Sequence, residues 1–324
     1  MTNLDPNPTE TVCATDEHGE IEVVEPRDVP LGGPRAMRVR RTLPVRSRTL
    51  IGSWCFVDHY GPDDVSESGG MRVARHPHTG LATVSWIFSG EIDHLDSAGN
   101  SAMVRPGELN LMIAGDGITH HEFSTPATSI LHGFQLWYAM PDSTRRRPPS
   151  FSHYVPDPVE GDGFVARVFI GDLLGASAPV ETFTPPLIGA ELRMEPGTRL
   201  VVDVDAAHEH GIVVDSGGVT VEGEQVIAGQ LAHVPVGRET VELVAGDSPA
   251  LIMFLGGEPL GEEIVMWWNF IGRSHEEIVA ARARYQEEIS GEFEGEERFG
   301  PYPDGLPDPL PAPTLPNARL RTRK

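Results

Sequence analysis

Short apolar runs, separated by turn residues, make up most of this chain. Residues 50–57, 82–88, 91–96, 109–113 and 130–138 are runs of this kind, and the turn S-A-G-N at 97–100 suits a hairpin connection. Runs of this length, with turn residues at intervals of roughly 8 to 12 positions, are typical of antiparallel sandwiches and barrels. The pattern therefore predicts an all-β fold.

The strand pattern occurs twice. A-T-V-S-W-I-F-S-G-E-I at 82–92 resembles E-H-G-I-V-V-D-S-G-G-V at 209–219, and R-P-G-E-L-N-L-M at 105–112 resembles I-A-G-Q-L-A-H-V at 227–234. An Arg- and Pro-rich stretch at 143–150 separates the two halves. This internal duplication predicts two β-barrels of common ancestry.

One helix is expected, near the C-terminus. Ser274 followed by Glu277 forms a capping box, and Gly291 can end the helix. Apolar residues on one face predict that it packs on the outside of a barrel. The expected organisation is a flexible acidic tail at 1–27, an N-terminal barrel at 28–142, a linker at 143–163, a C-terminal barrel plus helix at 164–290, and an extended Pro-rich tail at 291–324.

Composition limits the partners and the compartment. The formal charge of −23 argues against direct nucleic-acid binding, which needs clustered cations. The chain has two cysteines, so a disulfide framework is not expected, and a reducing cytoplasm fits. Its N-terminus is acidic where a secretory signal would be basic and then apolar, and no apolar run approaches the length of a membrane span. We therefore expect a soluble cytoplasmic protein without membrane contact.

Two histidine-containing pairs stand out as candidate chemistry. His76 and His78 lie in R-H-P-H-T-G, and His120 and Glu122 lie in G-I-T-H-H-E-F. Residues i and i+2 of a strand share one face, so two such strands side by side would direct three imidazoles and one carboxylate at one point, with His121 facing away. This donor set suits Fe, Ni, Cu, Zn or Mn and leaves room for water or substrate. The spacing predicts a metal site in the N-terminal barrel.

The second half contains another H-x-H, at His208 and His210. When Gly90 is aligned with Gly217, these histidines do not fall on the positions of His76 and His78. A solvated pair in a loop is the simpler interpretation, with a separate metal site as the alternative. No metal is expected in the C-terminal barrel.

The order of these features resembles the pirin family of bicupins over roughly residues 28–290. The resemblance rests on W-C-F-V-D-H-Y-G-P at 54–62, H-P-H-T-G at 76–80, G-E-I-D-H-L-D-S-A-G-N at 90–100, R-P-G-E-L-N-L-M-I-A-G-D-G-I-T-H-H-E at 105–122 and G-G-E-P-L-G-E-E-I at 256–264. It implies two stacked cupin-type (jelly-roll) barrels. It also implies one metal, most simply Fe(II), held by His76, His78, His120 and Glu122, with Mn, Ni, Cu and Zn as alternatives.

The resemblance implies two functions. Some pirins resemble quercetin 2,3-dioxygenases, in which case a small aromatic chelating substrate such as a flavonol would bind the metal, with Glu122 as general base. Pirins are also described as non-catalytic, metal-dependent regulators that act through protein partners. Whether the protein is catalytic is therefore left open. Separately, we expect it to be a monomer. A bicupin that holds no metal is a third alternative.

The chain departs from its relatives beside the second histidine. Relatives usually read H-P-H-R-G-F-E, whereas this chain has Thr79 and Ala82 in place of the Arg and the final Glu. The loss of that Glu leaves Glu122 as the only carboxylate candidate and predicts a change of polarity near the metal, which weakens the inferred activity but not the inferred metal binding. Phe56, Trp86, Met112 and Trp137 are expected to fill the core, with a position beside the metal cavity as the alternative.

Overall fold

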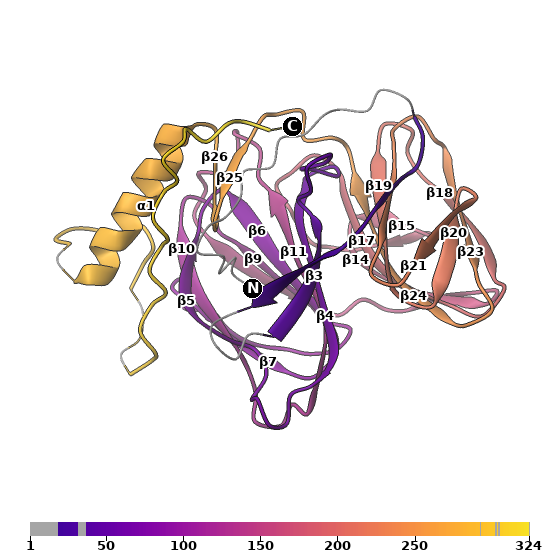
Figure 1. Cartoon of the computed structure of the whole chain (residues 1–324), viewed down its shortest axis with the longest axis horizontal. Coiled ribbons are helices and arrows are strands. Elements are labelled where there is room, and N and C mark those ends of the chain that lie inside the picture. Colours follow the sequence, from indigo (N-terminus) through magenta and orange to yellow (C-terminus); the bar gives the residue numbers. More distant parts are fainter. Residues whose placement is uncertain (1–18, 32–36, 292, 302, 304, 324) are drawn as a thin grey trace.

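The computed structural model describes residues 19–31, 37–291, 293–301, 303 and 305–323. Two β-barrels stand side by side, with one helix and the C-terminal segment on the outer side of the first (Figure 1). The sequence prediction of an all-β fold with two cupin-type barrels and a C-terminal helix is confirmed.

The N-terminal barrel is built from two antiparallel sheets. Its large sheet has the order β12 (Ser150–Tyr154), β9 (Leu109–Ile113), β6 (Leu81–Ser89), β11 (Ile130–Ala139), β4 (Trp54–Asp64), β3 (Met37–Leu43) and β2 (Arg27–Leu31). Its small sheet has the order β5 (Arg72–His78), β10 (Ile118–Ser124), β7 (Ile92–Asp96) and β8 (Ser101–Val104). The two predicted metal-binding pairs are therefore on neighbouring strands, β5 and β10.

The C-terminal barrel repeats this arrangement. Its large sheet runs β1 (Glu22–Val24), β22 (Leu231–Val234), β19 (Glu209–Ser216), β24 (Ala250–Gly257), β17 (Leu187–Met194), β14 (Phe164–Ile170) and β13 (Val159–Gly161). Its small sheet runs β18 (Arg199–Asp203), β23 (Thr240–Ala245), β20 (Gly218–Val221) and β21 (Glu224–Ile227). Two separate two-stranded ribbons remain, β15 (Asp172–Leu173) with β16 (Ala176–Ser177), and β25 (Val265–Trp267) with β26 (Phe270–Gly272); β26 contacts β5 of the N-terminal barrel.

The matching strand orders bear out the internal duplication. β6 and β19, which carry the first repeated segment, occupy the same place in their sheets, and so do β9 and β22, which carry the second. In the small sheets β18 and β23 correspond to β5 and β10. Leu200 and Val202 of β18 and Val241 and Leu243 of β23 belong to one buried apolar cluster. Apolar side chains of the C-terminal barrel thus occupy the region that corresponds to the histidines of the N-terminal barrel.

The large sheets face each other across an apolar layer. Residues of both barrels form this layer, among them Trp86, Phe134, Phe169 and Leu255. Two indoles also bridge the barrels, because Trp54 Nε1 donates to the carbonyl of Ile188 at 3.0 Å and Trp86 Nε1 donates to Glu191 at 2.8 Å. Burial of apolar area supplies the main driving force for this contact, and the hydrogen bonds satisfy the polar atoms within it.

Parts of the predicted tail and linker form strands. Residues 1–18 of the predicted acidic tail lie outside the described residues, but β1 lies within that tail and pairs with β22 of the C-terminal barrel, with Glu22 opposite His233. Within the predicted linker, β12 pairs with β9 and β13 pairs with β14. Backbone groups on the edge strands of the two large sheets gain partners in this way, which the sequence pattern of these segments did not indicate.

The C-terminal helix matches its prediction. Helix α1 (His275–Ser290) is capped by Ser274, whose side chain accepts from the N–H of Glu277, and Gly291 ends it in a left-handed conformation with φ of 74°. Its buried face packs on β25 and β26.

The chain after α1, predicted as an extended Pro-rich tail, has no helix or strand in its described residues and packs against the N-terminal barrel. Phe299, Ala312 and Leu320 are buried with residues of α1, and Arg323 bridges to Ile264. Figure 1 shows α1 and this segment beside β5 and β10. A few apolar side chains are therefore enough to fix this irregular segment on the barrel.

Candidate metal centre

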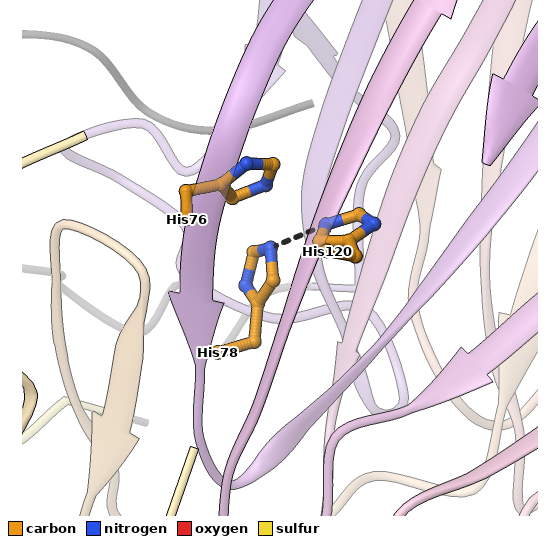
Figure 2. A group of neighbouring side chains, drawn as sticks. All are labelled: His76, His78 and His120. Atoms are coloured by element: carbon orange, nitrogen blue, oxygen red, sulfur yellow. Dashed lines mark hydrogen bonds between the residues drawn. The ribbon is translucent and has the colours of Figure 1, made fainter. Parts of the chain in front are cut away.

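Strand pairing positions three histidines together. β5 and β10 are antiparallel, with His76 opposite His120 and His78 opposite Ile118. Since alternate residues share a face, His76, His78 and His120 all enter the barrel interior, and each is fully buried. Figure 2 shows the rings of His78 and His120 pointing toward each other from neighbouring strands, with His76 beside them.

The nitrogen atoms of these rings meet at distances that suit a metal ion. One donor atom from each histidine lies within 4.8 Å of the others, and His78 Nε2 is 3.1 Å from His120 Nε2. Two nitrogens about 2.1 Å from one ion and at right angles to each other would lie about 3.0 Å apart. The ring centroids of His76 and His120 are 4.3 Å apart. The arrangement therefore fits a transition metal.

Hydrogen bonds orient two of the rings. His76 Nδ1 lies 2.8 Å from the carbonyl oxygen of Ala74 and donates to it, so its lone pair is on Nε2, a buried atom without a hydrogen-bond partner in the described part of the chain. His120 Nδ1 lies 3.3 Å from His94 Nδ1. Both contacts leave the Nε2 lone pairs free for a metal, which is how metal-binding histidines are usually held.

Burial keeps the imidazoles neutral. It lowers the pKa of His76 to about 3. Burial also lowers the pKa of His78 and of His120 well below the usual range, with the charge of His76 acting in the same direction. Neutral imidazole is the form that binds metal, so near neutral pH this cluster presents lone pairs rather than protons.

Glu122 lies to one side of the three histidines. It forms a second close group with His94 and His120, whose donor atoms also lie within 4.8 Å of one another. A bulge between His120 and Glu122 in the pairing with β5 accompanies this offset. Ser85 Oγ lies 3.3 Å from Glu122 Oε1. The four predicted residues are thus in one barrel interior, with the carboxylate beside the tri-histidine cluster rather than inside it.

His94 is a site residue that the sequence analysis did not identify. It lies on β7, directly opposite Glu122 in the pairing of β7 with β10. Its only signal in the sequence is a histidine in an alternating strand, I-D-H-L-D. Its role comes from its contact with His120, and the pairing of β7 with β10 brings these two histidines together. His121, by contrast, is absent from both groups and contacts Asp93 at 3.4 Å, as its expected outward orientation requires.

Two further expectations need correction. Ala82 belongs to the apolar layer between the barrels, so its difference from relatives does not alter the polarity at the metal cluster. His210 is buried on β19 rather than solvated in a loop, and burial lowers its pKa to about 4. Among the described residues, neither it nor His208 belongs to a group of three donors that could hold a metal.

The aromatic residues predicted to be in the core are buried, as is Met112. Trp137 stacks on Phe56 with centroids 4.0 Å apart and makes a T-shaped contact with His78 at a centroid distance of 5.0 Å. Trp137 therefore forms part of the wall of the metal cluster as well as part of the core.

Comparison with known proteins agrees with this architecture. The Pirin family model matches residues 36–138, and the model of the pirin C-terminal cupin domain matches residues 189–291. A "Pirin-like protein" of Caulobacter vibrioides is 33% identical over 76% of this chain and 88% of its own length. The chain belongs to the pirin family.

Other relatives of this pirin have names that refer to an activity. A Pseudomonas aeruginosa protein named "Putative quercetin 2,3-dioxygenase" is 39% identical over 91% of both chains. A crystal structure titled quercetin 2,3-dioxygenase, from Acinetobacter baumannii, superimposes with a TM-score of 0.86 at 33% identity, covering 94% of this pirin and 98% of that chain.

A second solved structure shares the fold only. It is the bacterial pirin YhhW of Escherichia coli in complex with nickel(II), which matches with a TM-score of 0.57 at 18% identity, over 74% of this pirin and all of that chain.

Within the described residues of this pirin, no helix is long and apolar enough to span a membrane.

Proposed function

We propose that this pirin is a metal-dependent dioxygenase of the quercetin 2,3-dioxygenase type, acting on a flavonol or a similar chelating aromatic. The observation that carries the proposal is the buried cluster of His76, His78 and His120, whose donor atoms lie within 4.8 Å of one another. The names of the Pseudomonas aeruginosa relative and of the Acinetobacter baumannii structure support the same reaction class. Fold alone would not, since one fold serves many functions.

The three histidines would hold the metal, with Glu122 as a fourth ligand or as a base beside it. We take Fe(II) as the working choice, because this donor set accepts most first-row metals and the O₂ chemistry calls for a redox-active one. When bound, the metal supplies a Lewis-acidic centre that polarises and orients the substrate oxygens. The reaction converts a flavonol and O₂ into a ring-opened ester and CO.

In this proposal Glu122 accepts the proton of the substrate 3-hydroxyl. It is fully buried, and its Oε1 is 3.3 Å from Ser85 Oγ, which in turn lies 3.0 Å from Gln135 Oε1. This connection keeps the carboxylate beside the cluster. A positioned general base typically contributes about 10²- to 10⁴-fold to a rate.

Polar atoms near Glu122 fit a substrate with several oxygens. Gln135 Nε2 and the hydroxyl of Tyr60 are buried and have no hydrogen-bond partner among the residues that the structure describes. Buried polar groups are rarely left without a partner, so these two donors suit a polyphenol or water. Because the histidines are fully buried, a substrate can reach them only when the surrounding chain opens.

The test is aerobic consumption of quercetin and O₂ by Fe(II)-reconstituted protein. We expect equal consumption of both by the wild type and background rates for His120→Ala, while His121→Asn, changed on the opposite face of the same strand, keeps its activity. Glu122→Gln should lower kcat by about 10²- to 10⁴-fold while its metal content stays unchanged.

Equal slow rates for wild type and His120→Ala would exclude the dioxygenase. If the wild type still bound a metal that His120→Ala lost, a non-catalytic metalloprotein that acts through a protein partner would be favoured instead. Less than about a tenth of a metal per chain after reconstitution would favour a bicupin without metal.

A further inference from the structure

A second cluster of metal-binding side chains lies between the two barrels. His59 of β4 and His132 of β11 come from the N-terminal barrel, and Asp215 of β19 comes from the C-terminal barrel. His59 Nε2 is 2.6 Å and His132 Nε2 is 2.5 Å from the same atom, Asp215 Oδ1. All three donor atoms lie within 4.8 Å of one another. This group shares no residue with the tri-histidine cluster.

A β-bulge in each barrel adjoins this group of side chains. The pairing of β11 with β4 shifts register between Leu131 and Gly133, and the extra residue of this irregularity is on β4, opposite His132. The pairing of β19 with β24 shifts between Val214 and Ser216, at Asp215. A bulge inserts one residue that is not paired in the ladder and redirects its side chain, and bulges are concentrated beside functional sites. Asp215 is thus the extra residue of its bulge, whereas His132 lies opposite the bulged part of β4 and pairs with Ser89 of β6.

We propose that His59, His132 and Asp215 bind a divalent transition-metal ion that links the two barrels. Two imidazoles and one carboxylate are the donor set of many iron, zinc and related sites, and with neutral imidazoles the set carries one negative charge. His59 and Asp215 are buried, whereas the side chain of His132 is 14% exposed. The ion would therefore be bound by His59 and Asp215 on its buried side. A coordination position would be accessible to solvent near His132.

Hydrogen bonds alone describe this cluster poorly. Both imidazoles would have to donate to one carboxylate oxygen, and His59 Nδ1 would remain buried without a partner within the described chain. Arg40 Nη2 also lies 3.1 Å from His59 Nε2. A guanidinium can only donate, so the contact with Arg40 requires a lone pair on His59 Nε2. The contact with Asp215, in contrast, requires a proton on that same nitrogen.

Arg40 is the competitor of the ion. It approaches the same His59 lone pair that a metal would use, and it is held there by a 2.6 Å bond to the carbonyl of Gly61. Binding would displace this contact, and the donor atoms would separate to about 3.0 Å, as expected for ligands at right angles about 2.1 Å from the ion. His132, the most exposed of the three, is the side chain best able to move.

Zn(II) titration of the metal-free full-length chain tests the proposal, with elemental analysis after desalting. We expect two ions per chain for wild type and one for His120→Ala, which keeps the inter-barrel site. Asp215→Asn removes the charge at constant size and should bind one. His132→Asn, at the partly exposed position, should also bind one ion per chain. It replaces Asp215→Asn in the test if that variant does not fold. Surface variant His153→Ala should keep two.

Arg40→Met gives an independent readout. Removing a positive charge beside the site should tighten binding of the second ion by roughly tenfold or more, since like charges at this distance repel strongly. A single ion in the wild type, lost in His120→Ala, would overturn the proposal and leave a hydrogen-bonded contact between barrels. A second ion that persists in both Asp215→Asn and His132→Asn would also overturn it.

Discussion

The imidazole of His94 stands directly behind that of His120, with their Nδ1 atoms 3.3 Å apart. Two Nδ1 atoms can share only one proton. His94 Nε2 lies 3.5 Å from Asp96 Oδ2, which favours a proton on that nitrogen and leaves His94 Nδ1 as the acceptor. His120 therefore donates through Nδ1, and its Nε2 lone pair faces His78. A residue that the sequence did not single out thus sets the tautomer of a predicted metal ligand.

This relationship predicts a metal-binding defect for His94→Phe. Phenylalanine keeps the ring but removes the acceptor of His120 Nδ1, and loss of such a partner typically weakens metal binding about 10- to 100-fold. Competition titration with a chromogenic chelator measures the affinity. His121→Phe is the matched control and should bind metal like the wild type. Equal affinities for wild type and His94→Phe would show that His94 has no part in orienting His120.

Acid should destabilise the metal-free protein through the buried histidines. An unfolded imidazole binds a proton below about pH 6.5, whereas folded His76 does so only at about pH 3. Between these values the unfolded chain holds more protons, so the free energy of unfolding decreases as pH falls. The slope is about 1.4 kcal/mol per pH unit for each such group.

Urea unfolding at pH 7, 6, 5 and 4 measures this dependence. Because carboxylates add their own pH dependence, the informative quantity is the difference between wild type and His76→Asn. The variant should show a shallower loss of stability from pH 6.5 downward. Parallel curves would mean that His76 is protonated in the folded protein as readily as in the unfolded chain.

Trp86→Phe should weaken the contact between barrels. Trp86 Nε1 donates to Glu191, whose side chain is 2% exposed, and the substitution leaves that carboxylate oxygen without its donor. An unpaired buried acceptor costs about 1–3 kcal/mol. Trp267→Phe is a control for the loss of indole volume, since Trp267 Nε1 has no partner in the described structure. Chemical denaturation that gives the same loss for both variants would contradict the prediction.

Phe299→Ala tests whether the C-terminal segment is part of the folded core. Phe299 is fully buried, its ring centroid lies 5.3 Å from that of Tyr285, and its N–H donates to Glu288 at 2.9 Å. Truncation should cost about 3–5 kcal/mol and expose the segment to limited proteolysis. Phe293→Ala, at a half-buried position outside this cluster, should cost clearly less. A loss below about 0.5 kcal/mol would indicate that the segment is dispensable.

Local patterns predicted much of the molecule. The boundaries of α1 follow from Ser274 and Gly291, because capping depends on residues that are neighbours in sequence. β9 has the predicted bounds, and β6, β7 and β11 each lie within one residue of theirs. The tails and linker were predicted less well, because β1 and β12 are short strands stabilised by partners distant in sequence.

The amino-acid sequence by itself determined the strand periodicity, the duplication and the shared face of His76 and His78, because alternation along a strand is a local property of the backbone. Tertiary structure alone decided that His94 supports His120, that Ala82 faces the other barrel, and that Asp215 reaches His59 and His132. These relationships depend on which strands pair and where bulges shift their register. Such choices are made by packing between segments far apart in the chain, which no local pattern specifies.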